Sequence, residues 1–111
     1  MDIAQYSSFE SLDIRVGTVI EIRTFDEARK PAYKLTIDFG KEIGQLHSSA
    51  QITQLYSLKD VLNRQVIAVV NFPPKQIANF ISECLVLGVY AKDGVVLLST
   101  ERPCANGDKL G

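Results

Sequence analysis

The strict alternation of apolar and polar residues in two stretches is the feature that most constrains how this chain folds. Ile14–Arg23 and Tyr33–Phe39 both alternate with a period of two. That period places successive side chains on opposite faces and is typical of half-buried β-strands. In the first stretch one face carries Ile14, Val16, Thr18, Ile20 and Ile22. Gly17 lies inside the same stretch and indicates a bulge or sharp bend there.

The rest of the chain predicts shorter strands and one helical insert. Apolar residues recur at roughly helical spacing over residues 50–62, which indicates one or two helical turns. The prolines at 73 and 74 end the strand before them, and residues 72–83 are expected to form a long connection. Ser7 and Glu10 have the spacing of a capping box and predict a short helical turn near the N-terminus. Further strands are expected at Gln45–Ser48, Val66–Val70, Leu85–Tyr90 and Val95–Leu98, with a tight hairpin turn at Lys92–Gly94.

This order of elements predicts an all-β protein. Five strands with a helical insert between the third and fourth match the OB-fold, a small Greek-key barrel. The last two strands add a hairpin and a tail at the C-terminal end. A small β-sandwich is the alternative fold. A chain of 111 residues fits one domain, so residues 1–111 are expected to form a single unit.

Charge and composition limit the function classes. The formal net charge is −1, so no global basic field draws the chain to nucleic acid or to an anionic membrane. Residues 29–75 nevertheless carry seven bases and three acids, a net of +4. This excess is either ordinary scatter of surface charge or a basic patch on one side of the domain.

The sequence also predicts a cytoplasmic location without membrane insertion. No apolar run approaches the roughly 18 residues of a membrane span, and the first residues lack a signal peptide's basic and apolar segments. The two cysteines cannot build a disulfide framework, which favours a reducing compartment.

Residues for catalysis are scarce. His47 is the single histidine and lies in a predicted strand, so a histidine metal site is excluded. Cys84 begins an apolar strand and is expected to be a buried, inert thiol, whereas Cys104 lies in an exposed tail. No phosphate-binding glycine loop or hydrolase motif is present. We therefore expect no catalytic residue, no metal and no cofactor.

Binding is better supported. In an OB-fold the ligand lies across strands two and three, between two loops. Here those loops are residues 25–32 and 72–83. They would bring basic and apolar side chains to one rim, which suits stacked bases and phosphates or an extended peptide. The basic residues are Arg29, Lys30, Lys34 and Lys75, and the apolar ones are Phe72, Ile77, Phe80 and Ile81. At least one of the two phenylalanines is expected to fold back into the loop core.

Several segments carry a family resemblance that covers nearly the whole chain. Asp13–Val19, read as D-I-R-V-G-T-V, resembles the opening of the tRNA-binding domain appended to methionyl-tRNA synthetases and found in free-standing relatives. Residues 37–40, 48–53 and 65–74 resemble the CsaA-type protein-secretion chaperones of the same family. The resemblance implies an OB-fold that forms a homodimer through both chain ends. Interface residues implied in this way are Tyr6, Phe9, Leu12 and Pro103.

The resemblance also implies ligands. A segment that contacts tRNA in tRNA-binding relatives is matched here by Asn71, Lys75, Ser82 and Glu83. This sequence differs from those relatives in two ways. Residues 75–79 carry fewer basic side chains, and Cys84 stands where the relatives usually have Gly followed by Met. Fewer basic side chains weaken the attraction to RNA phosphates. A chaperone for unfolded or presecretory polypeptides therefore ranks above a tRNA-binding protein. The secretion machinery is a candidate partner of such a chaperone. Candidate contacts for peptide or tRNA are Arg29, Lys30, Lys34, Ser48, Ser49, Gln51, Asn71, Phe72, Pro74, Lys75, Phe80, Ser82 and Glu83.

Overall fold

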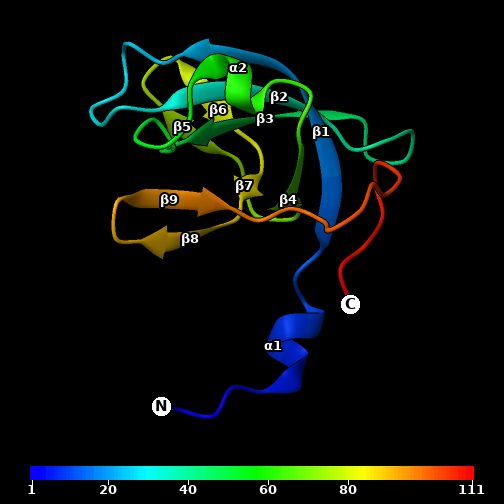
Figure 1. The fold of residues 1–111 in the computed structure, drawn as a ribbon. Coiled ribbons are helices and arrows are strands. Elements are labelled where there is room, and N and C mark those ends of the chain that lie inside the picture. Colours follow the sequence, from blue (N-terminus) through cyan, green and yellow to red (C-terminus); the bar gives the residue numbers. More distant parts are fainter.

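Five antiparallel strands form the main sheet of the computed structural model, which describes all of residues 1–111 (Figure 1). The strands follow each other in space in the order β3-β2-β1-β4-β7. Their bounds are Ile14–Thr24 for β1, Tyr33–Asp38 for β2, Gln45–Ala50 for β3, Gln65–Val69 for β4 and Leu85–Val86 for β7. The strands predicted from the alternating pattern are therefore present.

The two outer strands of this sheet approach each other and nearly close it into a barrel. The Glu83 amide donates a hydrogen bond to the His47 carbonyl at 2.7 Å. Next to it, the Ser48 hydroxyl donates to the carbonyl of Cys84 at 3.0 Å. These bonds join β3 to the residues just before β7, which leaves little open edge between them. The predicted five-stranded OB-fold is confirmed, and the β-sandwich alternative is excluded.

The helices are short. The insert α2, Leu58–Val61, lies between β3 and β4 as predicted. The N-terminal α1 spans Tyr6–Glu10, but its N-cap is Gln5, so the predicted capping box that starts at Ser7 is wrong. A capping box forms instead at α2, where the Ser57 amide donates to a carboxylate oxygen of Asp60 at 2.8 Å.

A β-bulge at Ile20 changes which face of β1 is buried. Val19 pairs with Ile37, but the next paired residue is Glu21, so Ile20 has no partner on β2. Val19 is fully buried, whereas Ile20 is 40% exposed. Beyond the bulge Ile22 packs toward the barrel interior, as Val19 does, whereas Ile14 lies on the outer face. The single face predicted for Ile14 to Ile22 is therefore wrong at Ile22, because one extra residue reverses the phase.

Gly17 serves close packing rather than the bulge. A Cβ at this position would lie 2.6 Å from Cγ2 of Ile37 and 2.7 Å from the ring of Phe39. Only a residue without a side chain lets these two core residues pack against β1. The bulge predicted at Gly17 occurs three residues later.

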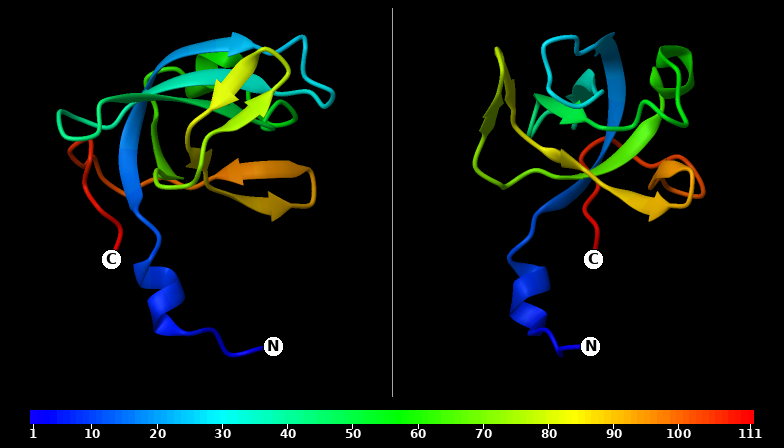
Figure 2. Two further views of the ribbon diagram at one scale, coloured as in Figure 1. Left: turned by 180° about the vertical axis from the view of Figure 1, so that it is seen from behind. Right: turned by 90° about the vertical axis from the view of Figure 1, so that its left-hand side faces the viewer.

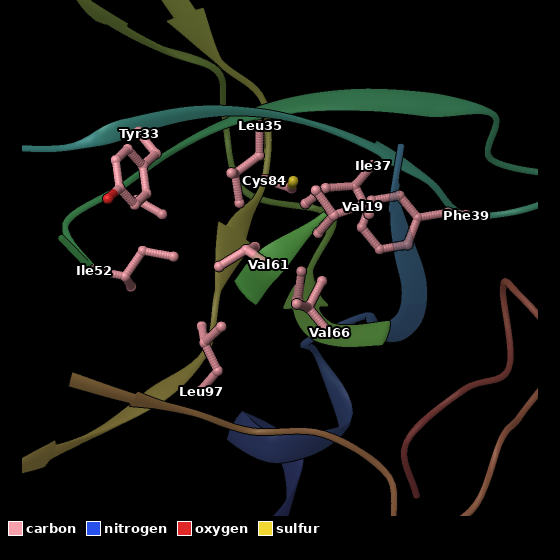
Figure 3. Close-up of a cluster of buried hydrophobic side chains, with 12 residues drawn as sticks. Val19, Tyr33, Leu35, Ile37, Phe39, Ile52, Val61, Val66, Cys84 and Leu97 are labelled. Atoms are coloured by element: carbon pink, nitrogen blue, oxygen red, sulfur yellow. The ribbon is translucent and has the colours of Figure 1, made fainter. Parts of the chain in front are cut away.

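The core has two parts, one inside the barrel and one outside. Figure 3 shows side chains of β1, β2, α2 and β4 meeting in the interior, among them Val19, Ile37, Phe39 and Val61. A second cluster lies on the outer face of β1 and β4 and contains Ile14, Val16, Ile67 and Val69. The C-terminal segment runs along β1, with the Val16 amide donating to the carbonyl of Asp108 at 2.9 Å.

Two hairpins extend the barrel. The hairpin of β8, Gly88–Ala91, and β9, Gly94–Leu97, was predicted, although the strand expected over Leu85–Tyr90 is divided into β7 and β8. The other hairpin, of β5, Lys75–Ile77, and β6, Phe80–Ser82, lies within the long connection predicted over residues 72–83, where no strand was expected. In Figure 2 this hairpin stands beside the barrel at the end that carries the β1–β2 loop.

The N-terminal helix projects away from the barrel. Figures 1 and 2 show α1 below the start of β1, with no other element packed around it. It carries no buried residue. No helix in the structure has the length and apolar character that crossing a membrane requires.

Candidate binding groove

A groove of about 780 Å³ lies between the β1–β2 loop and the β5–β6 hairpin. The end of β3 lines it through Ser49, and Gln51 follows directly after that strand. Arg29 and Lys30 of the loop and Lys75 of the hairpin all line this groove. The full lining is Glu27, Ala28, Arg29, Lys30, Ala32, Ser49, Gln51, Lys75, Gln76, Ile77 and Ala78.

The β1–β2 loop is fixed at its base and exposed at its tip. The side chain of Phe25 is buried, and its amide donates to the carbonyl of Ala32 at 3.1 Å. The Ala28 amide donates to the carbonyl of Phe25 at 3.3 Å. Arg29 and Lys30 follow this turn and are exposed. Hydrogen bonds within the loop therefore fix the backbone that carries Arg29 and Lys30 to the groove.

The β5–β6 hairpin is attached to β3 through polar side chains. The Ser49 amide donates to the hydroxyl of Ser82 at 3.0 Å. The His47 amide donates to Oε1 of Glu83 at 2.9 Å, and Nδ1 of the same histidine lies 2.9 Å from that oxygen. Ser82 and Glu83 were predicted as ligand contacts. The Ser82 hydroxyl and Oε1 of Glu83 are occupied by these bonds, which fix one wall of the groove.

Aromatic packing joins the hairpin to the loop. The ring of Phe80 meets the ring of Phe25 edge-on, with centroids 5.4 Å apart. Lys34 Nζ lies 5.2 Å from the centroid of Phe25 and 5.9 Å from that of Phe80, within the range of cation–π attraction. Phe80 is thus the phenylalanine that folds back, as expected for at least one of the pair, while Phe72 stays 43% exposed.

The predicted ligand residues divide among the groove and two smaller hollows. Those that line the groove are Arg29, Lys30, Ser49, Gln51 and Lys75. Lys34 and Phe80 line a neighbouring hollow of about 150 Å³ together with Arg23 and His47. Phe72, Ser82 and Glu83 line another hollow that also reaches Lys75. Pro74 is exposed between β4 and β5.

Ser48 is not a ligand contact. Its side chain is fully buried, and its hydroxyl donates to the carbonyl of Cys84. The prediction failed because alternation along β3 turns Ser48 toward the barrel interior while Ser49 faces the groove.

The side chain of Asn71 holds two backbone segments together. Its Oδ1 accepts a hydrogen bond from the Asp13 amide at 2.9 Å, and its Nδ2 donates to the carbonyl of Ser11 at 2.8 Å. The side chain thereby links the end of β4 to the segment that joins α1 to β1. Both polar atoms of the amide are used in this link, and Asn71 does not line the groove.

The sequence interpretation missed several lining residues. Gln76 and Ala78 come from the hairpin that was expected to be a loop, and Glu27 was not selected among the loop residues. The two-residue turn Ala78–Asn79 lacks the glycine that usually marks a hairpin, so its signal was weak. Ala78 instead adopts a positive φ of 52°.

The groove cations carry no ion pair within the chain. The salt bridges of the structure join Arg15 to Asp13, Arg23 to Glu21, His47 to Glu83 and Arg102 to Glu101. Arg29, Lys30 and Lys75 take part in none of them, and Glu27 is the one carboxylate that lines the groove. The groove therefore presents a local excess of positive charge to an incoming ligand.

The residues with shifted pKa values do not line the groove. A hydrogen bond from Arg15 holds the pKa of Asp13 below its ordinary value. Burial raises the pKa of the Cys84 thiol to about 12. A thiol with such a pKa is a poor nucleophile, in agreement with the inert cysteine predicted there. No group of three or more His, Cys, Asp and Glu residues is arranged to hold a metal ion.

The predicted interface residues lie at the two chain ends. Tyr6 is 72% exposed and Phe9 is 39% exposed, and their rings lie 6.2 Å apart on α1. Pro103 is exposed in the C-terminal segment. Leu12 differs because it packs partly against the outer core cluster of its own chain.

Fold and sequence together define the class of protein. The chain belongs to the family described as "Putative tRNA binding domain", whose model matches residues 14–109. It is 31% identical over 110 residues to the methionine–tRNA ligase of Pyrococcus horikoshii. That alignment covers 99% of this chain and 15% of the ligase, so the chain spans a small part of the length of this relative.

Among solved structures the chain is similar to chaperones named CsaA. The CsaA chaperone protein from Picrophilus torridus is 54% identical, with a TM-score of 0.94, and the match covers 98% of this chain and 100% of that one. The chaperone CsaA from Bacillus anthracis is 49% identical, with a TM-score of 0.92, and the match covers 99% and 100%. The resemblance to CsaA-type members of the tRNA-binding family is confirmed.

Proposed function

We propose that the chain is a homodimeric, CsaA-like chaperone that holds unfolded or presecretory polypeptides in the groove between the β1–β2 loop and the β5–β6 hairpin. It acts by binding and not by catalysis. The observation that carries this proposal is the convergence of unpaired Arg29, Lys30 and Lys75 beside apolar groups such as Ile77. Similarity to two CsaA chaperones over nearly the full chain supports it.

The composition of the groove favours polypeptide over RNA. Its apolar lining residues are Ala28, Ala32, Ile77 and Ala78, and no aromatic ring lies among them. Nucleic-acid affinity depends on many phosphate contacts and on aromatic platforms for bases, and a groove with three cations offers few of either. Small apolar side chains with flanking cations suit a variable peptide.

Pairing of two copies would cover the apolar chain ends. Tyr6 and Phe9 on α1 are exposed, and each ring has only the other as an aromatic neighbour. Exposed apolar patches of this kind mark interaction surfaces in soluble proteins. We include the exposed Pro103 in the same interface because the C-terminal segment runs beside β1, from which α1 projects.

The proposed location is the cytoplasm, with the secretion machinery as a partner that receives the client chain. Both cysteines are free in the structure, as is usual for proteins of a reducing compartment.

Binding of tRNA is the second candidate function. Family membership and the 31% identity to a methionine–tRNA ligase favour it. The surface for it is the hollow on strands β1 to β3, where Arg23, Lys34 and His47 surround Phe80. This surface is next to the groove, so a single protein can carry both activities.

A direct comparison of the two ligands tests the proposal. The purified protein is titrated with a permanently unfolded polypeptide, reduced and carboxymethylated α-lactalbumin, and separately with bulk tRNA, and anisotropy is measured over a range of salt concentrations. We expect saturable polypeptide binding that persists at moderate salt. Tight tRNA binding with a steep salt dependence, together with no polypeptide binding, would establish the second function in its place.

A further inference from the structure

The groove runs along the free edge of strand β5. The β5–β6 hairpin is a sheet of two strands, so β5 has one edge that no other strand covers. Successive side chains of a strand point to opposite faces. Nevertheless the consecutive residues Lys75, Gln76, Ile77 and Ala78 all line the groove. A surface that touches every residue in turn follows the edge of the strand and not one of its faces.

The pairing of the hairpin identifies which backbone groups are free on that edge. Ile77 and Phe80 flank the two-residue turn and form the pair that closes it. In such a hairpin the closing pair exchanges both hydrogen bonds, and the next pair, Gln76 with Ile81, exchanges none. The N–H and C=O groups of Gln76 therefore point away from β6. No turn or loop hydrogen bond uses them.

We propose that an extended polypeptide segment with acidic side chains binds by adding a strand to this edge of β5. The inference rests on the proposed polypeptide-binding function and specifies how the client is held. The Gln76 backbone would pair with the client backbone, as in other cases of strand addition. Carboxylates of the client would meet Lys75 on the same strand and Arg29 on the facing loop.

This mode of binding explains how one groove accepts many clients. Backbone hydrogen bonds are the same for every sequence, so affinity does not depend on particular side chains. The cations add a preference for acidic segments, because Glu27 is the only carboxylate in the lining. The sugar–phosphate backbone of RNA carries no repeating N–H and C=O groups to pair with Gln76 as a strand does, so this mode separates polypeptide from RNA.

Backbone N-methylation of a peptide tests the proposal. The probe is a short fluorescein-labelled peptide of alternating Val and Glu residues. Methyl groups on the Val nitrogens block one edge of its extended form, and methyl groups on the Glu nitrogens block the other. We expect at least one singly blocked peptide to bind within about twofold of the parent, and the doubly blocked peptide to lose about tenfold or more.

A variant of the protein provides an independent arm. Gln76→Pro removes the outward N–H but none of the hairpin's own donors, and proline is tolerated at such edge positions. Gln76→Ala is the matched control, because it removes the side chain and keeps the N–H. We expect the proline variant to weaken binding of the parent peptide severalfold more than the alanine variant does. Circular dichroism checks that both variants fold, and the N-methylated peptides need no variant.

The outcomes distinguish this inference from the function on which it rests. If the doubly blocked peptide binds as tightly as the parent, strand addition is wrong, while polypeptide binding stands. If neither the peptide nor unfolded α-lactalbumin binds, the proposed function itself fails. A Lys-for-Glu peptide that binds as well as the acidic one would overturn the preference for carboxylates.

Discussion

Arg29 lies in the β1–β2 loop and Lys75 begins strand β5, yet both residues line the same groove. The barrel causes this meeting. The β5–β6 hairpin is bonded to the end of β3, where the Ser49 amide donates to the Ser82 hydroxyl. That end of β3 pairs with the start of β2, directly after the β1–β2 loop, so the hairpin and the loop reach the same end of the molecule. The charge excess of residues 29–75 therefore becomes a local patch instead of scatter, at least for these residues and Lys30.

Removing a groove cation should weaken client binding. We expect Arg29→Ala and Lys75→Ala each to reduce affinity for an acidic unfolded polypeptide severalfold, because each removes one charge that faces the ligand and has no partner in the protein. The effect should shrink as salt is added. Lys92→Ala, in the exposed turn between β8 and β9, is the matched control. Equal affinity losses for all three variants would contradict the assignment.

A side chain at position 17 should destabilise the barrel. Gly17→Ala would place a methyl group 2.6 Å from Ile37 and 2.7 Å from Phe39, and overpacking of this kind costs about 1–3 kcal/mol. Denaturant unfolding measures the loss. Gly111→Ala, where no atom lies within 4 Å of the added group, should leave the stability unchanged. An unaltered midpoint for the position 17 variant would show that the core is looser than described.

Stability should fall at alkaline pH through Cys84. Burial raises the pKa of its thiol to about 12, whereas the unfolded chain loses this proton near 9.0. Between these values the folded state holds more protons, so this group lowers the free energy of unfolding by about 1.4 kcal/mol per pH unit. Below pH 9 it has no effect.

Chemical denaturation at pH 8 and pH 10 of the wild type and of Cys84→Ala tests this titration. The decrease on going to pH 10 should be smaller in the variant, because lysines and tyrosines contribute equally to both proteins. A thiol reagent at pH 8 should label Cys104 and spare Cys84 until the protein is unfolded. Identical pH slopes would contradict the role of the thiol.

Removing the apolar side chains of α1 should produce monomers. Tyr6 and Phe9 are exposed in the single chain, so Phe9→Glu would place a charge in the proposed interface without disturbing the fold. Size-exclusion chromatography with light scattering measures the mass. Leu58→Glu, an exposed apolar residue on α2, is the control and should remain dimeric. A wild-type protein that is monomeric at high concentration would contradict the proposed dimer.

The barrel was predictable because its signals are local. The alternation of Tyr33–Phe39 and the β-branched run Val66–Val70 fix the positions of two strands, and the glycines at 40 and 44 mark the hairpin between β2 and β3. The bulge at Ile20 was not predictable, because it depends on how β2 pairs with β1 and not on the residues of β1 alone.

The sequence predicted which basic residues meet at the groove, but not the side chains and the hairpin that form its walls. OB-fold topology was enough to bring Arg29 and Lys75 together. The link made by Asn71 depends on hydrogen bonds to backbone groups far away in the sequence. The β5–β6 hairpin has no glycine turn and was missed, and with it the residues that form the edge of the groove.

Site-specific photo-crosslinking shows whether polypeptide occupies the groove. A benzoylphenylalanine replaces Gln51, which is exposed at the groove, or Asp93, which lies in the turn between β8 and β9. Each variant is irradiated with unfolded α-lactalbumin and with tRNA. We expect a polypeptide adduct from position 51 and none from position 93. An adduct from position 93 alone, or an adduct at position 51 with tRNA and none with polypeptide, would contradict it.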